Sequence, residues 1–176
     1  MSQDAPPASP SLAERMHEHI AEAVPFTPTR ALDAVRDAHE TVQVPAAQFA
    51  EAARWLRDRA GFTRFIDLTC VDDPERPADQ GGRFEVQLVV YSMTERRWAR
   101  LKTRTTELMP SVTPLFAGAH NFEREVFDLF GVRFDGHPRL TRILMPEEWQ
   151  GHPLRRDQAM PFEPADFTVT RDRYRT

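Results

Sequence analysis

The stretch Arg83-Phe-Glu-Val-Gln-Leu-Val-Val-Tyr91 decides the fold. Its apolar side chains recur at every second position and share one face of an extended chain; they are Phe84, Val86, Leu88 and Val90. A turn around Thr94 and Glu95 separates this stretch from a second extended run, Arg97 to Thr105. The two runs predict a β-hairpin with one face in a hydrophobic core.

The segments before the hairpin supply a helix and another strand. Pro45 suits the first position of a helix and Gly61 the position after its last. The apolar stripe between them has helical spacing and comprises Phe49, Ala52, Ala53, Leu56 and Ala60. Phe62 to Val71 predicts a strand, which an acidic loop from Asp72 to Gly82 joins to the hairpin. These elements predict an α+β fold: a two-layer domain with a mainly antiparallel sheet packed on helices.

The N-terminal segment is less regular. Residues 1–10 are polar and rich in proline, and we expect a disordered tail there. Ser11 can cap a helix that runs to Ala23, with an apolar face of Leu12, Met16 and Ile20. Residues 29–44 are ambiguous, because their first part has the composition of a helix and their last part that of a strand.

A second clear helix is predicted from Ala119 to Phe130, after a helical turn at 110–116, and Gly131 can end it. Arg124 and Asp128 lie four residues apart on its polar side and can pair.

Glu123 falls inside the apolar arc of this helix. A buried carboxylate without a partner is costly, so Glu123 should meet a cation or several hydrogen-bond donors. Arg133 and Arg142 are the candidate cations. The alternative is an amphipathic helix on which Glu123 reaches solvent.

From Val132 onward no strong periodicity remains. The chain therefore divides into the tail (1–10), an α+β domain (11–131) and an extended C-terminal arm (132–176). Residues 142–149 carry large apolar groups that a solvated tail would not usually retain. The arm either folds back on its own sheet or docks on a partner, and the residues alone leave both open.

Composition excludes several functions. The 176 residues are 40% hydrophobic and 28% charged with a net charge of −4, which is typical of a soluble domain and gives no sign of a nucleic-acid partner or of a basic patch for lipid. No apolar run is long enough to span a bilayer, and the N-terminus does not resemble a secretory signal. A single cysteine, Cys70, excludes an internal disulfide and a four-thiolate iron–sulfur cluster. No glycine-rich nucleotide motif occurs.

Two Gly-His-Pro tripeptides bracket the apolar part of the arm, at 136–138 and 151–153. With Glu147 between them, His137 and His152 are the candidates for a metal site in an independent metalloenzyme. The spacing does not suit a helical pair of ligands, so histidines that fix loop geometry by hydrogen bonds are the better interpretation.

Residues 110–157 resemble the signature of the respiratory complex I 30 kDa subunit family, whose bacterial members belong to NADH:quinone oxidoreductase. The matching strings are Glu123-Arg124-Glu125, Asp128-Leu-Phe-Gly131-Val132, Gly136-His137-Pro138, Arg142-Ile-Leu144 and Trp149-Gln-Gly151-His152-Pro153-Leu-Arg155-Arg156-Asp157. The resemblance also favours a β-hairpin for residues 30–44.

The resemblance implies a non-catalytic subunit of the hydrophilic arm of a proton-translocating enzyme. Such a chain carries no cofactor; FMN and iron–sulfur clusters lie on partner subunits, and the C-terminal arm wraps over the large subunit that forms the quinone cavity. Membrane association, on the cytoplasmic side of the cell membrane, would come only through this hetero-oligomer. We expect the contacts and structural motifs to fall on Glu123, Arg124, Asp128, Gly131, His137, Pro138, Arg142, Trp149, Gly151, His152, Pro153, Arg155 and Arg156.

Three positions depart from the family pattern, namely Asn121, Arg139 and Thr141. The family commonly has tryptophan, aspartate and arginine there, so Arg139 reverses a charge within the arm. An equivalent subunit of a membrane-bound hydrogenase, or of a quinone reductase fed by another donor, is the alternative within the same family.

Overall fold

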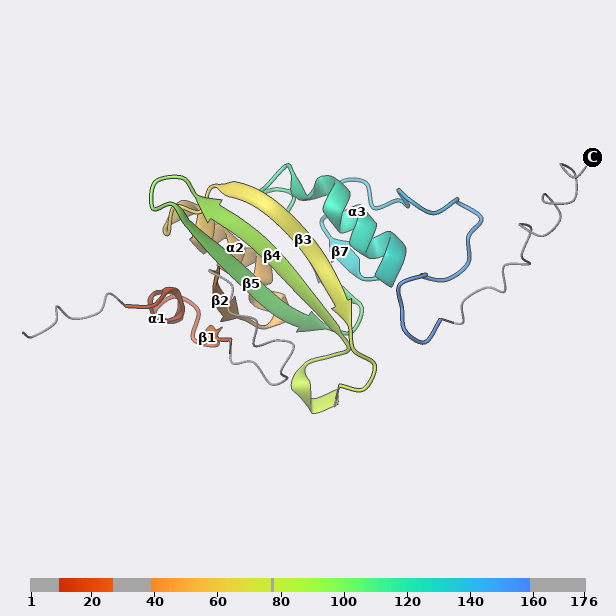
Figure 1. The fold of residues 1–176 in the computed structure, drawn as a ribbon, viewed down its shortest axis with the longest axis horizontal. Coiled ribbons are helices and arrows are strands. Elements are labelled where there is room, and N and C mark those ends of the chain that lie inside the picture. Colours follow the sequence, from red (N-terminus) through yellow and green to blue (C-terminus); the bar gives the residue numbers. More distant parts are fainter. Residues whose placement is uncertain (1–9, 27–38, 77, 159–176) are drawn as a thin grey trace, which may run out of the picture.

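The computed structural model describes residues 10–26, 39–76 and 78–158 of the chain. Its centre is a five-stranded sheet with the strand order β1-β2-β5-β4-β3 (Figure 1). The strands are β1 Val24–Pro25, β2 His39–Gln43, β3 Arg64–Asp72, β4 Phe84–Ser92 and β5 Arg97–Thr105. Neighbouring strands are antiparallel except for β2 and β5, which are parallel. The predicted α+β fold with a mainly antiparallel sheet is confirmed.

The hairpin of β4 and β5 forms the middle of the hydrophobic core. Val86, Leu88 and Val90 point to one side of β4 and are fully buried, as their period of two predicted. Leu88 pairs with Leu101 of β5 in the antiparallel register, and Leu101 is also fully buried.

Helix α2 (Phe49–Asp58) packs on this side of the sheet and follows a short 3-10 turn, η2 (Ala46–Gln48). Its predicted apolar stripe is buried along the whole length, at Phe49, Ala52, Ala53, Leu56 and Ala60. Helix α1 (Leu12–His17) begins where expected, because the Ser11 hydroxyl accepts a hydrogen bond from the backbone N–H of Glu14. It ends before the predicted Ala23, since the chain then turns into β1, which pairs with β2.

Helix α3 (Ala119–Phe130) packs over β3 (Figure 1). The ring centroid of Phe122 lies 5.2 Å from that of Phe65 in an edge-to-face arrangement, which joins the helix to the strand. The helix has the predicted bounds, and Gly131 ends it in the left-handed region with a φ of 81°.

The domain core extends beyond the boundary expected at Gly131. Strand β7 (Arg133–Asp135) pairs in parallel with β6 (Leu108–Pro110), and Val132 and Phe134 are buried in the core. Residues 132–135 therefore pack with the domain, because this pairing joins two segments far apart in the sequence. The arm is accordingly described below from residue 136.

Two expectations fall largely outside the described residues: the tail at 1–10 and the hairpin at 30–44. Within the described part, β2 begins at His39, and η3 (Ala78–Gln80) lies in the acidic loop. The helices of these described ranges are all too short or too polar to cross a bilayer.

Candidate functional site

The arm, residues 136–158, lies against α3. It contains no helix or strand, and it leaves β7, passes α3 and returns toward the end of β3 and β4 (Figure 1). Gly136 and Gly151 turn the chain with φ angles of 81° and 86°, which glycine adopts without a steric penalty. Without strand pairing in this segment, side chains must hold it in place.

Asp128 anchors the middle of the arm to α3. Its side chain is fully buried, and Oδ2 accepts hydrogen bonds from the backbone N–H groups of Ile143 at 3.0 Å, Leu144 at 2.8 Å and Met145 at 2.9 Å. Oδ1 accepts from Arg142 Nη1 at 2.6 Å. Burial acts to raise the pKa of Asp128, but the hydrogen bonds outweigh burial and the pKa is lowered. The carboxylate therefore stays charged and fixes consecutive residues of the arm.

Two arginines bridge the arm and the helix. Arg142 also donates to the Gly151 carbonyl at 3.0 Å, which joins the two halves of the arm. Arg124 donates to the carbonyl of Arg142 at 2.9 Å and to that of Thr141 at 3.1 Å. The predicted pair of Arg124 with Asp128 is wrong, because the arm offers carbonyls to the arginine and N–H groups to the carboxylate.

The second half of the arm caps the C-terminal end of α3. The last carbonyls of a helix lack partners within it, and donors from the arm supply them. The pairs of donor and carbonyl are His152 Nδ1 with Asp128, Leu154 N–H with Leu129, and Arg155 Nε with Phe130. The charge of Arg155 also suits the negative end of the helix dipole. Gly131 permits this approach, since a Cβ there would lie 2.6 Å from Nε2 of His152 and closer still to Arg155.

The end of the described arm is held to the sheet by an ionic latch of Asp72, Arg83 and Asp157. The Arg83 guanidinium donates to Asp72 Oδ2 at 2.7 Å and, on its other side, to Asp157 at 2.6 and 2.7 Å. Asp72 accepts a further hydrogen bond from the backbone N–H of Arg156 at 2.7 Å. Hydrogen bonds from Arg83 lower the pKa of Asp157 to about 2. This planar, two-sided recognition holds the last described residues of the arm against the sheet.

Glu123 faces the core rather than the arm. It is fully buried and accepts hydrogen bonds from the Ser111 hydroxyl and the Val112 N–H, both at 2.7 Å. The prediction that Glu123 meets several donors is confirmed. The predictions of a pair with Arg133 or Arg142, and of a glutamate that reaches solvent, are wrong. The turn after β6 brings its donors to the carboxylate, while Arg142 is bound by Asp128 and Arg133 is exposed.

The histidines of both Gly-His-Pro tripeptides fix loop geometry by hydrogen bonds, as predicted. His137 donates from Nε2 to the His120 carbonyl at 3.1 Å and accepts at Nδ1 from the Arg139 N–H at 3.0 Å. His137 thus lies at the first turn of α3 and His152 at the last, and Glu147 is exposed. The structure does not bring the proposed metal ligands together. Within the described ranges, no three His, Cys, Asp or Glu side chains are grouped to hold a metal ion.

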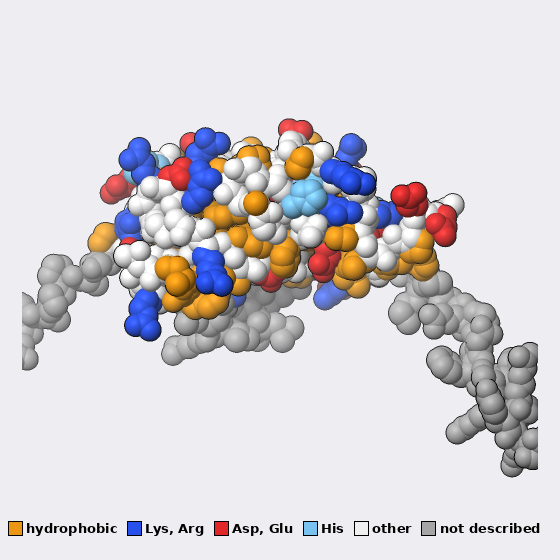
Figure 2. All heavy atoms as spheres, turned by 90° about the horizontal axis from the view of Figure 1, so that it is seen from above, with side chains coloured by type: hydrophobic (Ala, Val, Ile, Leu, Met, Phe, Trp, Pro, Cys, Tyr) orange, Lys and Arg blue, Asp and Glu red, His pale blue; other side chains and the backbone are white. Residues whose placement is uncertain are grey.

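Several apolar side chains of the arm face solvent. Ile143, Leu144 and Leu154 are 38%, 59% and 52% exposed. The indole N–H of Trp149, in the same arm, is buried without a hydrogen-bond partner. Figure 2 shows hydrophobic side chains gathered on one face of the molecule, and at its right-hand end they adjoin acidic ones. Asp128 fixes the backbone of Ile143 and Leu144, and the described part of the chain leaves their side chains exposed.

Most of the predicted interface residues hold the arm within the chain, namely Arg124, Asp128, Gly131, His137, Arg142, Gly151, His152 and Arg155. Pro138 and Arg156 are exposed, and Trp149 and Pro153 are half-buried. Sequence reasoning missed Asp72, Arg83 and Ser111. Asp72 and Arg83 could have been predicted to pair, because they are opposite charges at the two ends of the acidic loop. No local sequence pattern indicated that Ser111 would bind Glu123.

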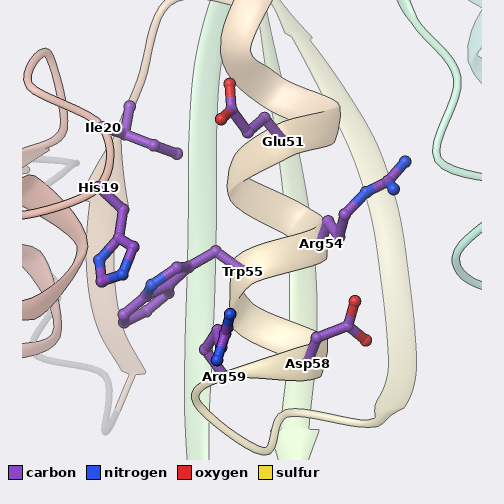
Figure 3. Close-up of a pocket in the computed structure, with 7 residues that line it drawn as sticks. All are labelled: His19, Ile20, Glu51, Arg54, Trp55, Asp58 and Arg59. Carbon is purple, nitrogen blue, oxygen red and sulfur yellow. The ribbon is translucent and has the colours of Figure 1, made fainter.

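A separate pocket of about 440 Å³ lies between the turn after α1 and helix α2 (Figure 3). The exposed ring of His19 lies 5.8 Å from the buried ring of Trp55, and charged side chains of both signs surround them. These charged residues are Glu51, Arg54, Asp58 and Arg59. None of the residues that line this pocket belongs to the arm or to α3.

Comparison with known sequences connects most of the chain to one family. Residues 42–163 match the family described as respiratory-chain NADH dehydrogenase, 30 Kd subunit. Among the relatives is an NADH-quinone oxidoreductase subunit of Caulobacter vibrioides, which is 46% identical over 124 residues, 68% of this chain and 61% of the relative. The chain thus spans about three fifths of the length of that relative.

Solved structures show the same architecture. A trypsin-resistant fragment of Nqo5 superposes with a TM-score of 0.51 at 30% identity, over 57% of this chain and 81% of the fragment. A chain of an archaeal respiratory membrane complex, the membrane-bound sulfane sulfur reductase, has a TM-score of 0.66 at 23% identity, over 92% of this chain and 88% of that chain. The second likeness concerns the fold alone.

Proposed function

The chain belongs to the family of the respiratory-chain NADH dehydrogenase 30 Kd subunit, and from this premise we propose that it is a non-catalytic peripheral-arm subunit of a proton-translocating NADH:quinone oxidoreductase. In this role it supports the quinone-reducing module while electrons pass from NADH through FMN and iron–sulfur clusters to quinone. The cofactors belong to partner subunits, and the chain reaches the cytoplasmic side of the cell membrane through them.

The observation that carries this proposal is the arm. Its backbone is held by a buried carboxylate and by helix capping, yet Ile143, Leu144 and Leu154 point outward. A segment ordered in advance loses less conformational entropy on binding, and exposed aliphatic groups then contribute apolar area. The arm therefore has the properties of a preformed docking strip.

The partner we propose for this strip is the large subunit that forms the quinone cavity. Obligate interfaces of this kind are large and apolar, and they resemble a domain core that has been divided. The contribution of this chain to catalysis is then positional, since it stabilises the neighbours between which electrons pass.

A tagged full-length chain, expressed in its own host and purified from membranes, tests the proposal. Leu144→Asp places a charge at the centre of the strip and should reduce the recovery of partner chains and the NADH:quinone activity of the membranes by at least about tenfold. Met93→Asp is the matched control, because Met93 in the β4–β5 turn is also 59% exposed. Equal recovery of partners with both variants would refute docking through the strip.

The recovered partners also distinguish the electron donor. An NADH-oxidising flavoprotein among them supports the proposed enzyme. Hydrogenase chains or another donor module, without NADH activity, would instead place the subunit in a related complex and overturn that part of the proposal.

A further inference from the structure

Glu123 and two hydroxyl side chains form a continuous hydrogen-bonded chain from the core toward the surface. Glu123 Oε2 lies 2.7 Å from Ser111 Oγ, which lies 2.7 Å from Thr113 Oγ1. Glu123 is fully buried, Ser111 is 7% exposed, and Thr113 is partly exposed. This series of hydrogen bonds therefore connects the buried carboxyl group of Glu123 to the partly exposed Thr113 through two hydrogen bonds.

The hydroxyl groups can point in either direction along this chain. With Glu123 ionised, Thr113 donates to Ser111 and Ser111 donates to the carboxylate. With Glu123 neutral, the carboxyl donates to Ser111 and Ser111 donates to Thr113, so that every hydroxyl is still satisfied. Only the hydrogen atoms move, which is the property of a proton relay.

No ion pair holds Glu123 in its charged form within the described part of the chain. Arg57 of α2 donates to the Leu115 carbonyl, and Arg124 of α3 donates to the arm. The other charged or titratable groups of α3 are His120, which contacts Asn121 and His137, Asp128, which binds the arm, and the exposed Glu125. Those of β3 are the exposed Arg64, the partly exposed Asp67, the buried Cys70, and Asp72, which binds Arg83. Those of β7 are the exposed Arg133 and Asp135. Burial raises the pKa of Glu123 to about 7, although hydrogen bonds from Ser111 and from the Val112 and Thr113 backbone act to lower it.

We propose that Glu123 is a proton-binding site, loaded and emptied through Ser111 and Thr113, that couples protonation to the packing of α3 on the turn at 111–116. For uptake, Thr113 receives a proton from solvent and passes its own to Ser111, which passes its own to Glu123 Oε2. One O–H bond forms and one breaks at each hydroxyl, so Glu123 alone changes its charge. Ionisation then places an unpaired charge in the core and loosens this packing.

Infrared spectroscopy of the full-length chain tests whether the site exists. A neutral carboxyl group absorbs apart from a carboxylate, and we expect one such band to persist well above the pH at which exposed carboxyl groups ionise and to disappear around neutral pH. Glu123→Gln should remove that band. If this variant does not fold, the wild-type titration still decides, because full ionisation of every carboxyl group by pH values of about 5.5 would overturn the proposal.

Two further variants test the relay. Ser111→Ala removes a donor to the ionised form and should raise the midpoint by roughly one pH unit. Thr113→Val interrupts the outer step and should slow proton exchange of the carboxyl group by at least about tenfold, measured by exchange broadening of its carbon resonance. Thr63→Val, at an exposed threonine, is the control. An unchanged midpoint in the first variant, or an unchanged exchange rate in the second, would refute the relay.

Discussion

A single carboxylate, that of Asp128, replaces the backbone pairing that the arm lacks. One of its oxygens collects the N–H groups of Ile143, Leu144 and Met145, and the other binds Arg142. Backbone N–H groups converging on a charged oxygen give hydrogen bonds about twice as strong as neutral ones. The backbone position of residues 143–145 therefore depends chiefly on one side chain of α3.

Replacement of Asp128 by asparagine tests this dependence. The variant removes the charge, and its amide NH2 group would face either the N–H groups or the guanidinium. We expect the free energy of unfolding, measured with urea, to fall by about 2–4 kcal/mol. Glu125→Gln, on the exposed side of the same helix, should change it by less than about 0.5 kcal/mol. Similar losses in the two variants would contradict the anchoring role.

Gly131 and Gly136 form a natural pair for separating backbone strain from contact with the arm. Both have a φ of 81°, so alanine would have to adopt a left-handed conformation at either site. A Cβ at Gly131 would collide with His152 and Arg155, whereas at Gly136 it would meet nothing within 4 Å. We expect Gly131→Ala to cost at least about 1 kcal/mol more than Gly136→Ala in thermal unfolding. An equal loss of stability in the two variants would mean that the arm can move away from Gly131 without an energetic cost.

The ionic latch connects two elements, the arm and the β3–β4 end of the sheet, and its response to pH follows from its carboxylates. The pKa of Asp157 is lowered to about 2, chiefly by hydrogen bonds from Arg83. A depressed folded-state pKa gives stability that is present above the unfolded value and lost as the pH falls through the folded one.

We therefore expect the arm end to release between pH values of about 4 and about 2. Chemical shifts of the Arg156 and Asp157 amides should report this release, while those at the centre of β4 stay constant until unfolding. Arg83→Gln should remove the transition, because Asp157 then loses its charged partner. Persistence of the same transition in the variant would show that another group holds the arm end.

Local sequence patterns were sufficient to predict the helices and strands whose packing partners are close in the sequence. The alternation in 83–91 predicted β4, and Gly131 predicted the end of α3. The parallel pairs of β2 with β5 and of β6 with β7 were not predictable in this way, since each joins segments separated by a long stretch of chain. Such pairing depends on tertiary packing, which leaves no local period.

In the candidate site, the partners of the charged groups were likewise not predictable from local sequence patterns. Spacing on the helix suggested that Arg124 would pair with Asp128, and burial suggested an arginine for Glu123. Both carboxylates instead bind backbone N–H groups, which every residue except proline carries and which no sequence pattern marks. The sequence indicated that each carboxylate needs hydrogen-bond donors. Which groups donate depends on the path of the backbone, which the sequence pattern does not show.

At the scale of the whole molecule, Cys70 lies on β3, the strand of the central sheet against which α3 packs. This thiol is 5% exposed on β3 and is the only cysteine of the chain. Burial is the largest cause that raises its pKa to about 12, and the arm's Arg155 is close enough to act against that rise. The reactivity of one thiol therefore reports whether the assembled core stays closed.

Alkylation of Cys70 measures this closure directly. The rise in pKa from 9.0 to about 12 lowers the thiolate fraction by about 1,000-fold, and the thiolate is the reactive form. Steric protection by the core acts in the same direction. We expect iodoacetamide at pH values of about 8 to label the native chain at least about 1,000-fold more slowly than the chain unfolded in urea. Labelling of both states at similar rates would mean that the core around β3 opens readily, and the sheet could then not serve as the rigid support from which α3 and the latch hold the arm.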